Sequence, residues 1–194
     1  MSQPELIRKS GQLFIAAAFA FVTILSGSDP IAIPGSVIAA ILLAVGMSGL
    51  RSAYRETISP PGRNMLLLGM LGPVLWIVAM AFLVLTAERI PMEQGLWVLI
   101  FVGPAISLLG LTLFGLTALG SKPMPRLNWL PFFTGIWYPV TFILFSVYDI
   151  SHKGVFPDQY LPALVVTVLI QFLALCWFGS TLISDSRMEP ATAR

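Results

Sequence analysis

The sequence predicts an all-α integral membrane protein whose six transmembrane helices follow one another as three helical hairpins, with both termini in the cytoplasm. Three observations predict this fold: an apolar composition, six uncharged runs of bilayer length, and an uneven distribution of lysine and arginine. Of 194 residues, 57% are hydrophobic and 10% are charged, whereas a soluble domain carries about 25% charged residues. Lipid must therefore be the solvent for most of the chain.

Six apolar runs are long enough to cross the roughly 30 Å hydrocarbon core of a bilayer, which takes about 20 residues of helix. In chain order they cover residues 11–27, 31–50, 65–86, 96–119, 129–148 and 160–184. A transmembrane β-barrel would instead need short segments of alternating polarity. The runs define hairpin units at about residues 11–50, 65–119 and 129–184. We expect one transmembrane bundle over residues 1–194, with short cytoplasmic tails.

The first run follows Arg8 and Lys9 and therefore resembles the start of a secretory signal peptide. It is long for the apolar core of such a peptide, and no convincing small-residue cleavage motif lies near its end. We expect an uncleaved first helix. Because residues four apart share one face of a helix, the second run predicts close packing of that face against another helix. Its small residues at this spacing are Ala32, Ser36, Ala40, Ala44 and Ser48.

The third to sixth runs contain matched motifs that indicate an internal repeat. GMLGPV at residues 69–74 matches GIWYPV at 135–140, and LFGLTAL at 113–119 resembles WFGSTLI at 177–183. The members of each pair are about 65 residues apart, and such regular self-similarity is typical of repeat architectures. We interpret the chain as three hairpins that run in the same direction, the first shorter and more diverged. The alternative is coincidence among helices that use few residue types.

Proline lies near the middle of three runs. Pro73 and Pro139 occupy equivalent places in the matched motifs, and Pro104 lies near the middle of the fourth run. Proline removes one helical hydrogen bond, and membrane helices tolerate it where neighbouring groups satisfy the freed carbonyl. Three kinks at similar depth predict either a cavity beside them or a particular packing of the helices.

The basic residues predict the orientation of the bundle. With six crossings both termini share a side, and nine of the eleven lysines and arginines fall on that side. The two others are Arg89 and Lys153. The positive-inside rule then places the basic side in the cytoplasm, and we expect a bacterial plasma (inner) membrane as the location. The basic residues form no cluster that would indicate nucleic-acid binding.

Ionisable side chains are absent from the six runs, which contain no Asp, Glu, Lys, Arg or His. Because an ionisable residue inside a span marks a functional site by default, this argues against a proton relay, a voltage sensor and a Schiff-base lysine. The single histidine, His152, and the single cysteine, Cys176, exclude a bis-histidine haem and a multi-cysteine metal site. We expect no catalytic residue, no cofactor, no metal site and no enzymatic activity.

Polar and aromatic residues near the prolines form the candidate site. Gln171 is the most polar side chain within the runs, and it shares a helix face with Thr167. An interhelical hydrogen bond is the ordinary role of such a residue, and contact with a neutral ligand is the alternative. If the kinks enclose a ligand cavity, its lining residues are Pro73, Trp76, Pro104, Ser107, Trp137, Tyr138, Pro139, Thr167 and Gln171.

The missing catalytic and coupling residues lead to two hypotheses about function. The first is an accessory, assembly or structural membrane subunit whose partners are membrane lipid and other membrane-protein subunits, with a lipid or another hydrophobic ligand between its hairpins. The second is a small carrier or pore for a neutral or apolar solute, which parallel repeats and aligned prolines would suit. A lipid-modifying enzyme is a weaker third hypothesis, because it would depend on scattered outer-loop residues: Glu88, Glu93, Asp149 and His152.

Overall fold

The computed structural model describes residues 2–26, 29–86, 96–151 and 161–187. These residues form six α-helices and one short 3-10 helix, and none of them forms a β-strand. The prediction of an all-α fold is confirmed. The elements are α1 (Gln3–Val22), η1 (Thr23–Ser26), α2 (Asp29–Ala53), α3 (Pro60–Thr86), α4 (Leu96–Ser121), α5 (Leu130–Ser151) and α6 (Leu161–Asp185).

Three helical segments are long and apolar enough to cross a membrane. They are Pro34–Ala53 in α2, Gly103–Ser121 in α4 and Val165–Asp185 in α6. The chain therefore has the character of a membrane protein. Within the described residues the number of such segments is three, whereas the sequence predicted six. In α1, three charged residues (Glu5, Arg8 and Lys9) lie within its 20 residues and lower its apolar character.

Two helices begin at places that differ from the predicted apolar runs. Helix α1 begins at Gln3, well before residue 11, with Pro4 and Glu5 in its first turn. Proline is favourable there because its missing N–H would have no partner within the helix, and a carboxylate interacts well with the positive end of the helix dipole. Helix α3 begins at Pro60, because Ser59 accepts a hydrogen bond at its Oγ from the Gly62 N–H, at 3.4 Å.

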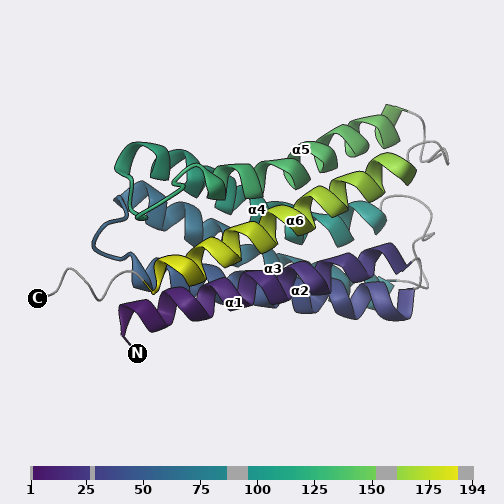
Figure 1. Cartoon of the computed structure of the whole chain (residues 1–194). Helices are drawn as coiled ribbons and strands as arrows, with labels where there is room; N and C mark the ends of the chain where they lie inside the picture. The colour runs from purple at the N-terminus through teal and green to yellow at the C-terminus, as the bar shows by residue number, and fades with distance from the viewer. Residues whose placement is uncertain (1, 27–28, 87–95, 152–160, 188–194) are drawn as a thin grey trace, which may run out of the picture.

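The six helices form a closed ring. Each helix packs against its neighbours in the chain, and α6 packs back against α1 (Figure 1). Helix α4 also contacts α2, and its segment Gly103–Ser121 is the most buried of the three membrane-length segments. Helix α1 begins and α6 ends at the same end of the bundle, where the α2–α3 and α4–α5 connections also lie (Figure 1). We call this the terminal end.

Glycine allows three pairs of helices to approach at backbone distance. A Cβ atom on Gly11 of α1 would lie 2.5 Å from the carbonyl oxygen of Gly179 on α6, and a Cβ on Gly179 would lie 2.5 Å from that of Gly11. A Cβ on Gly110 of α4 would overlap the backbone nitrogen and Cα of Gly69 on α3. In α5, a Cβ on Gly135 would lie 2.5 Å from the Leu108 carbonyl oxygen of α4. Close packing is what holds helices together in lipid.

The glycines also bear on the predicted repeat. Gly69 and Gly135 hold equivalent places in the matched motifs, and both face α4. Gly69 therefore faces the second helix of its own hairpin, whereas Gly135 faces a helix of the preceding hairpin. The internal repeat stays a prediction from sequence, and these two glycines differ in their partners.

Large aromatic side chains fill the inside of the ring. The ring centroids of Phe14 (α1) and Phe178 (α6) are 4.9 Å apart. Phe21 of α1 meets Tyr138 of α5 edge-to-face at 5.2 Å. The outer surface is also apolar, as expected where lipid is the solvent. Its exposed side chains include Phe19, Leu71, Val78, Leu85, Ile143 and Leu173.

Candidate functional site

The most polar of the predicted site residues, Gln171, links α5 to α6. Its side chain is fully buried (0% exposed), and its Nε2 donates a hydrogen bond to the Thr134 carbonyl oxygen at 2.7 Å. The Thr134 hydroxyl donates in return to the Ala174 carbonyl oxygen at 3.4 Å. Gln171 Oε1 accepts no hydrogen bond from any residue that the structure describes. Gln171 therefore makes an interhelical hydrogen bond through Nε2, and its Oε1 has no donor among the described residues.

Ser107 lies at the α3–α4 contact, and Pro73 and Pro104 are close to it in sequence, next to Gly72 and Gly103. All three are buried, and Ser107 is 0% exposed. A Cβ on Gly72 of α3 would overlap the Ser107 Oγ and the Gly103 carbonyl oxygen, so the two helices touch at this level. Within the described part of the chain, the Ser107 Oγ has no hydrogen-bond partner. This is a second interhelical cluster with a buried polar atom.

The other predicted residues occupy different surroundings. Tyr138 and Pro139 are buried, and Tyr138 packs on Phe21. Thr167 donates its hydroxyl proton to the Ala163 carbonyl oxygen at 2.9 Å and lies 3.5 Å from the Thr141 hydroxyl on α5. Trp137 lies on the outer surface of the bundle, and the side chain of Trp76 lies outside the described residues.

The polar predicted site residues therefore lie in two clusters, Ser107 between α3 and α4, and Thr167 with Gln171 between α5 and α6, whereas Tyr138 packs on α1. Helix α4 joins them, since Gly135 of α5 faces Leu108 and Thr112 on α4. A ligand cavity shared by the helices that contain Pro73, Pro104 and Pro139 stays a prediction. Trp137 belongs to neither cluster, because its side chain turns outward.

Trp137 is part of an exposed aromatic cluster on α5 and α6, which we call the aromatic face. Its members are Trp129, Phe133, Trp137 and Trp177. Trp129 and Trp177 meet edge-to-face at 5.4 Å, and Phe133 and Trp137 at 5.6 Å. The three tryptophans are 37%, 37% and 46% exposed in chain order. The sequence showed each ring, but only the α5–α6 packing brings them to one outer face.

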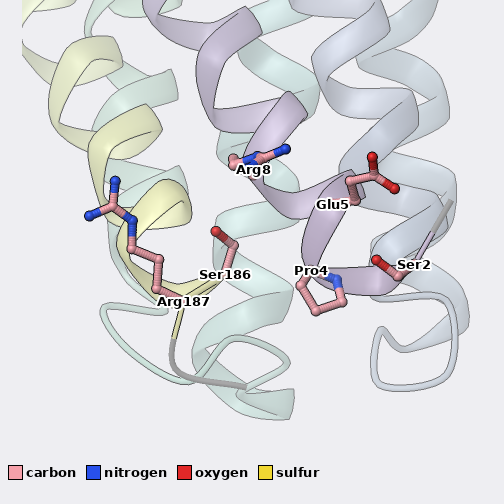
Figure 2. A pocket seen from close by; sticks show the side chains of 6 residues that line it. All are labelled: Ser2, Pro4, Glu5, Arg8, Ser186 and Arg187. Atoms are coloured by element: carbon pink, nitrogen blue, oxygen red, sulfur yellow. The ribbon is translucent and has the colours of Figure 1, made fainter. Parts of the chain in front are cut away.

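The described residues also form a pocket of about 290 Å³ at the terminal end, between the start of α1 and the end of α6. Figure 2 shows Ser186 and Arg187, from the end of α6, beside side chains from the first turns of α1. The pocket, which we call the terminal pocket, is lined by Ser2, Pro4, Glu5, Arg8, Ser186 and Arg187. Ser186 is buried, and its hydroxyl donates to the Ile183 carbonyl oxygen at 2.7 Å.

The terminal pocket carries more positive than negative charge. Arg8 and Arg187 are exposed at its wall, and neither forms an ion pair with a carboxylate among residues 2–26, 29–86, 96–151 and 161–187. Ser2, the N-cap residue of α1, makes no side-chain capping hydrogen bond. The pocket offers guanidinium groups and helix-terminal N–H groups, which suit binding of an anion.

Sequence reasoning missed this pocket because it used Arg8 and Arg187 only as indicators of orientation. They are far apart in the chain, and they line one pocket because α6 packs against α1. Asp185, which directly follows the sixth predicted run, is 2% exposed. The membrane-length segment of α6 includes this residue, so the sequence did not indicate a buried carboxylate at the end of α6.

Neither the aromatic face nor the terminal pocket has the arrangement of a metal site, and the described residues contain no group of three metal-ligating side chains. The arrangement thus offers aromatic surface and anion-binding groups. Comparisons with protein-family models, curated proteins and solved structures find no match for this chain.

Proposed function

We propose that the chain is an accessory or assembly subunit that crosses a bacterial plasma membrane six times, with both termini in the cytoplasm. The observation that carries the proposal is the aromatic face, which exposes three tryptophans on one outer surface of the bundle. Its partner on that surface is another membrane-protein subunit.

Helix length and charge support six crossings. The six helices contain 20 to 27 residues, which corresponds to about 30–40 Å at 1.5 Å per residue. No Asp, Glu, Lys, Arg or His occurs in residues 65–86, 96–121, 130–148 or 161–184. The described basic residues lie at the terminal end, where both termini would face the cytoplasm. They are Arg8, Lys9, Arg51, Arg55, Arg63, Lys122, Arg126 and Arg187.

Cysteine labelling in intact cells tests this orientation. In a Cys176→Ser background, a cysteine placed at exposed Arg55 should react with a membrane-impermeant maleimide only after the cells are opened. A cysteine placed at Arg89 should react in intact cells. Equal labelling of both positions in intact cells would contradict the proposed topology.

The depth of the aromatic face supports a protein partner. Tryptophan anchors normally lie at the level of the lipid headgroups. Trp129 precedes α5 and suits that role, and Trp177 lies at the same level, since its ring centroid is 5.4 Å from that of Trp129. Trp137 lies about 12 Å further along α5. Tryptophan is the residue type most enriched at the energetic centres of protein interfaces. The deep, exposed indole of Trp137 is therefore better explained by a helix packed on it than by anchoring.

Crosslinking in native membranes tests the accessory role. We expect a discrete higher-mass complex for the natural chain, and we expect the Trp137→Ala/Trp177→Ala variant to lose most of it. The control variant, Leu71→Ala/Val78→Ala, removes exposed apolar groups of α3 and should keep the complex. Purification in mild detergent that yields only an isolated monomer, without partner or lipid, would count against the proposal.

The second candidate function is a small carrier or pore for a neutral or apolar solute. The buried Ser107 Oγ and Gln171 Oε1 favour it, because both are polar atoms inside the bundle without a hydrogen-bond partner among the described residues. A flux assay in reconstituted vesicles tests it. If Pro73→Ala and Pro139→Ala leave the flux unchanged, the aligned prolines no longer support a carrier or pore.

A further inference from the structure

We infer that the terminal pocket binds a phosphate group, and that the phosphate belongs to the headgroup of an anionic phospholipid. The inference rests on the proposed membrane location. Four observations support it: two guanidinium groups without ion pairs, an uncapped helix N-terminus, the position of the pocket at the end of a membrane-length helix, and its size.

The first observation is the pairing of Arg8 with Arg187 at one pocket. The two residues come from opposite ends of the chain, and the α1–α6 contact brings them together. Arginine presents its N–H groups as a planar fork that fits two oxygens of a phosphate. No described carboxylate pairs with either guanidinium group, so both are available to a ligand.

The second observation is the start of α1, which forms part of the same wall. Ser2 is the N-cap residue and makes no capping hydrogen bond through its side chain. The Leu6 N–H bonds to the Ser2 carbonyl oxygen at 3.1 Å, which leaves the N–H groups of Gln3 and Glu5 without a partner in the helix. These groups and the helix dipole favour an anion at this end.

The third and fourth observations concern place and size. The membrane-length segment of α6 ends at Asp185, and the next two residues, Ser186 and Arg187, line the pocket. The pocket thus lies where the hydrocarbon core gives way to headgroups. Its volume of about 290 Å³ lies at the lower end of the roughly 300–1,000 Å³ of small-molecule pockets. The pocket therefore suits a headgroup rather than a whole lipid.

Glu5 is the group in the pocket that opposes this ligand. Its carboxylate lines the wall together with the two arginines, so the lining carries one net positive charge. A phosphate must bind despite this repulsion, and removal of the Glu5 charge should strengthen binding. This sign distinguishes a phosphate from a cationic ligand, for which loss of the same carboxylate would weaken binding.

Titration of the detergent-solubilised full-length chain tests the inference, with thermal stabilisation as the measure of binding. We expect phosphatidylglycerol to stabilise the protein and phosphatidylcholine to do so much more weakly. Each basic residue beside an anionic lipid contributes a factor of about five in affinity. Arg8→Gln/Arg187→Gln should therefore bind about 30-fold more weakly, while Glu5→Gln should bind about fivefold more tightly.

The matched control is Arg55→Gln/Arg126→Gln, which removes the same charge from exposed arginines outside the pocket. It should bind within about twofold of the natural chain. Equal weakening in both double variants, or natural affinity in Arg8→Gln/Arg187→Gln, would overturn the inference. So would equal stabilisation by phosphatidylcholine.

Glycerol 1-phosphate distinguishes a lipid headgroup from a soluble phosphate compound. Competition with phosphatidylglycerol supports recognition of the phosphate group in the pocket. Stabilisation by glycerol 1-phosphate with none by phosphatidylglycerol would overturn the lipid assignment. Because cell fractionation tests the membrane location separately, a failure of this inference can be told apart from a failure of the proposed function.

Discussion

Adding one methyl group at Gly110 should force α3 and α4 apart. In the Gly110→Ala variant, the new Cβ would overlap the backbone nitrogen and Cα of Gly69 and would lie 2.7 Å from the Met65 carbonyl oxygen. All three neighbours are main-chain atoms, so no change of side-chain rotamer relieves the overlap. Ordinary contacts of a Cβ begin near 3.4 Å, and the helices must therefore separate locally by about 1 Å.

The cost follows from this separation. Overpacking costs about 1–3 kcal/mol, and a gap of up to about 1 Å forfeits a quarter to a half of the dispersion attraction between facing atoms. We place the cost at the upper end, about 3 kcal/mol, because rigid backbone faces rigid backbone. Alanine restores about 1 kcal/mol of helix propensity relative to glycine. The net loss of about 2 kcal/mol should lower the Tm by about 4–8 °C for a chain of this size.

Thermal unfolding in detergent, followed by size-exclusion chromatography, measures the effect. Gly120→Ala is the matched control in the same helix, since a Cβ there meets nothing within 4 Å. Gly69→Ala should fall between the two, because its nearest neighbour is the movable Met47 Sδ at 2.6 Å. A Tm of Gly110→Ala equal to that of Gly120→Ala would refute the reasoning.

Three further predictions follow from packing inside the ring. Gln171→Leu should change the free energy of unfolding by less than about 1 kcal/mol, because it removes a hydrogen bond and an unpartnered Oε1 together. Gln171→Glu should lower the Tm markedly at pH 8, since it buries a charge at a site that is 0% exposed. Phe14→Ala should lower the free energy of unfolding by about 3–5 kcal/mol, because Phe14 is buried. Phe19→Ala should lower it by under about 1 kcal/mol, because Phe19 is 62% exposed. Chemical unfolding of both variants checks this difference.

The helices were largely readable from the sequence, because an uncharged run of bilayer length has few alternatives to a helix. Four of the six helices match their predicted runs within a few residues, while α1 begins earlier, at Gln3, and α3 at Pro60. The extension of α1 had a local signal, since Pro4 and Glu5 are favourable in a first turn. A search for apolar runs missed this extension, because Arg8 and Lys9 precede the run at residues 11–27.

The candidate site was predictable only in part. Ser107 and Gln171 lie buried at interhelical contacts, in the way that polar residues in uncharged spans suggest. Trp137 directly precedes buried Tyr138, yet it faces outward and joins the aromatic face. Neighbouring residues on a helix point about 100° apart, and in an almost uniformly apolar helix no polar stripe marks which side faces lipid.

The order of the residues thus dictates helices, their lengths and the grouping of basic residues at one end, since these depend on local hydropathy and spacing. The closed ring, the glycine contacts and the terminal pocket depend on which helices touch. The lipid around the bundle and the side chains inside it are about equally apolar. Hydrophobicity therefore does not choose the partners, and backbone fit at positions such as Gly11 against Gly179 does.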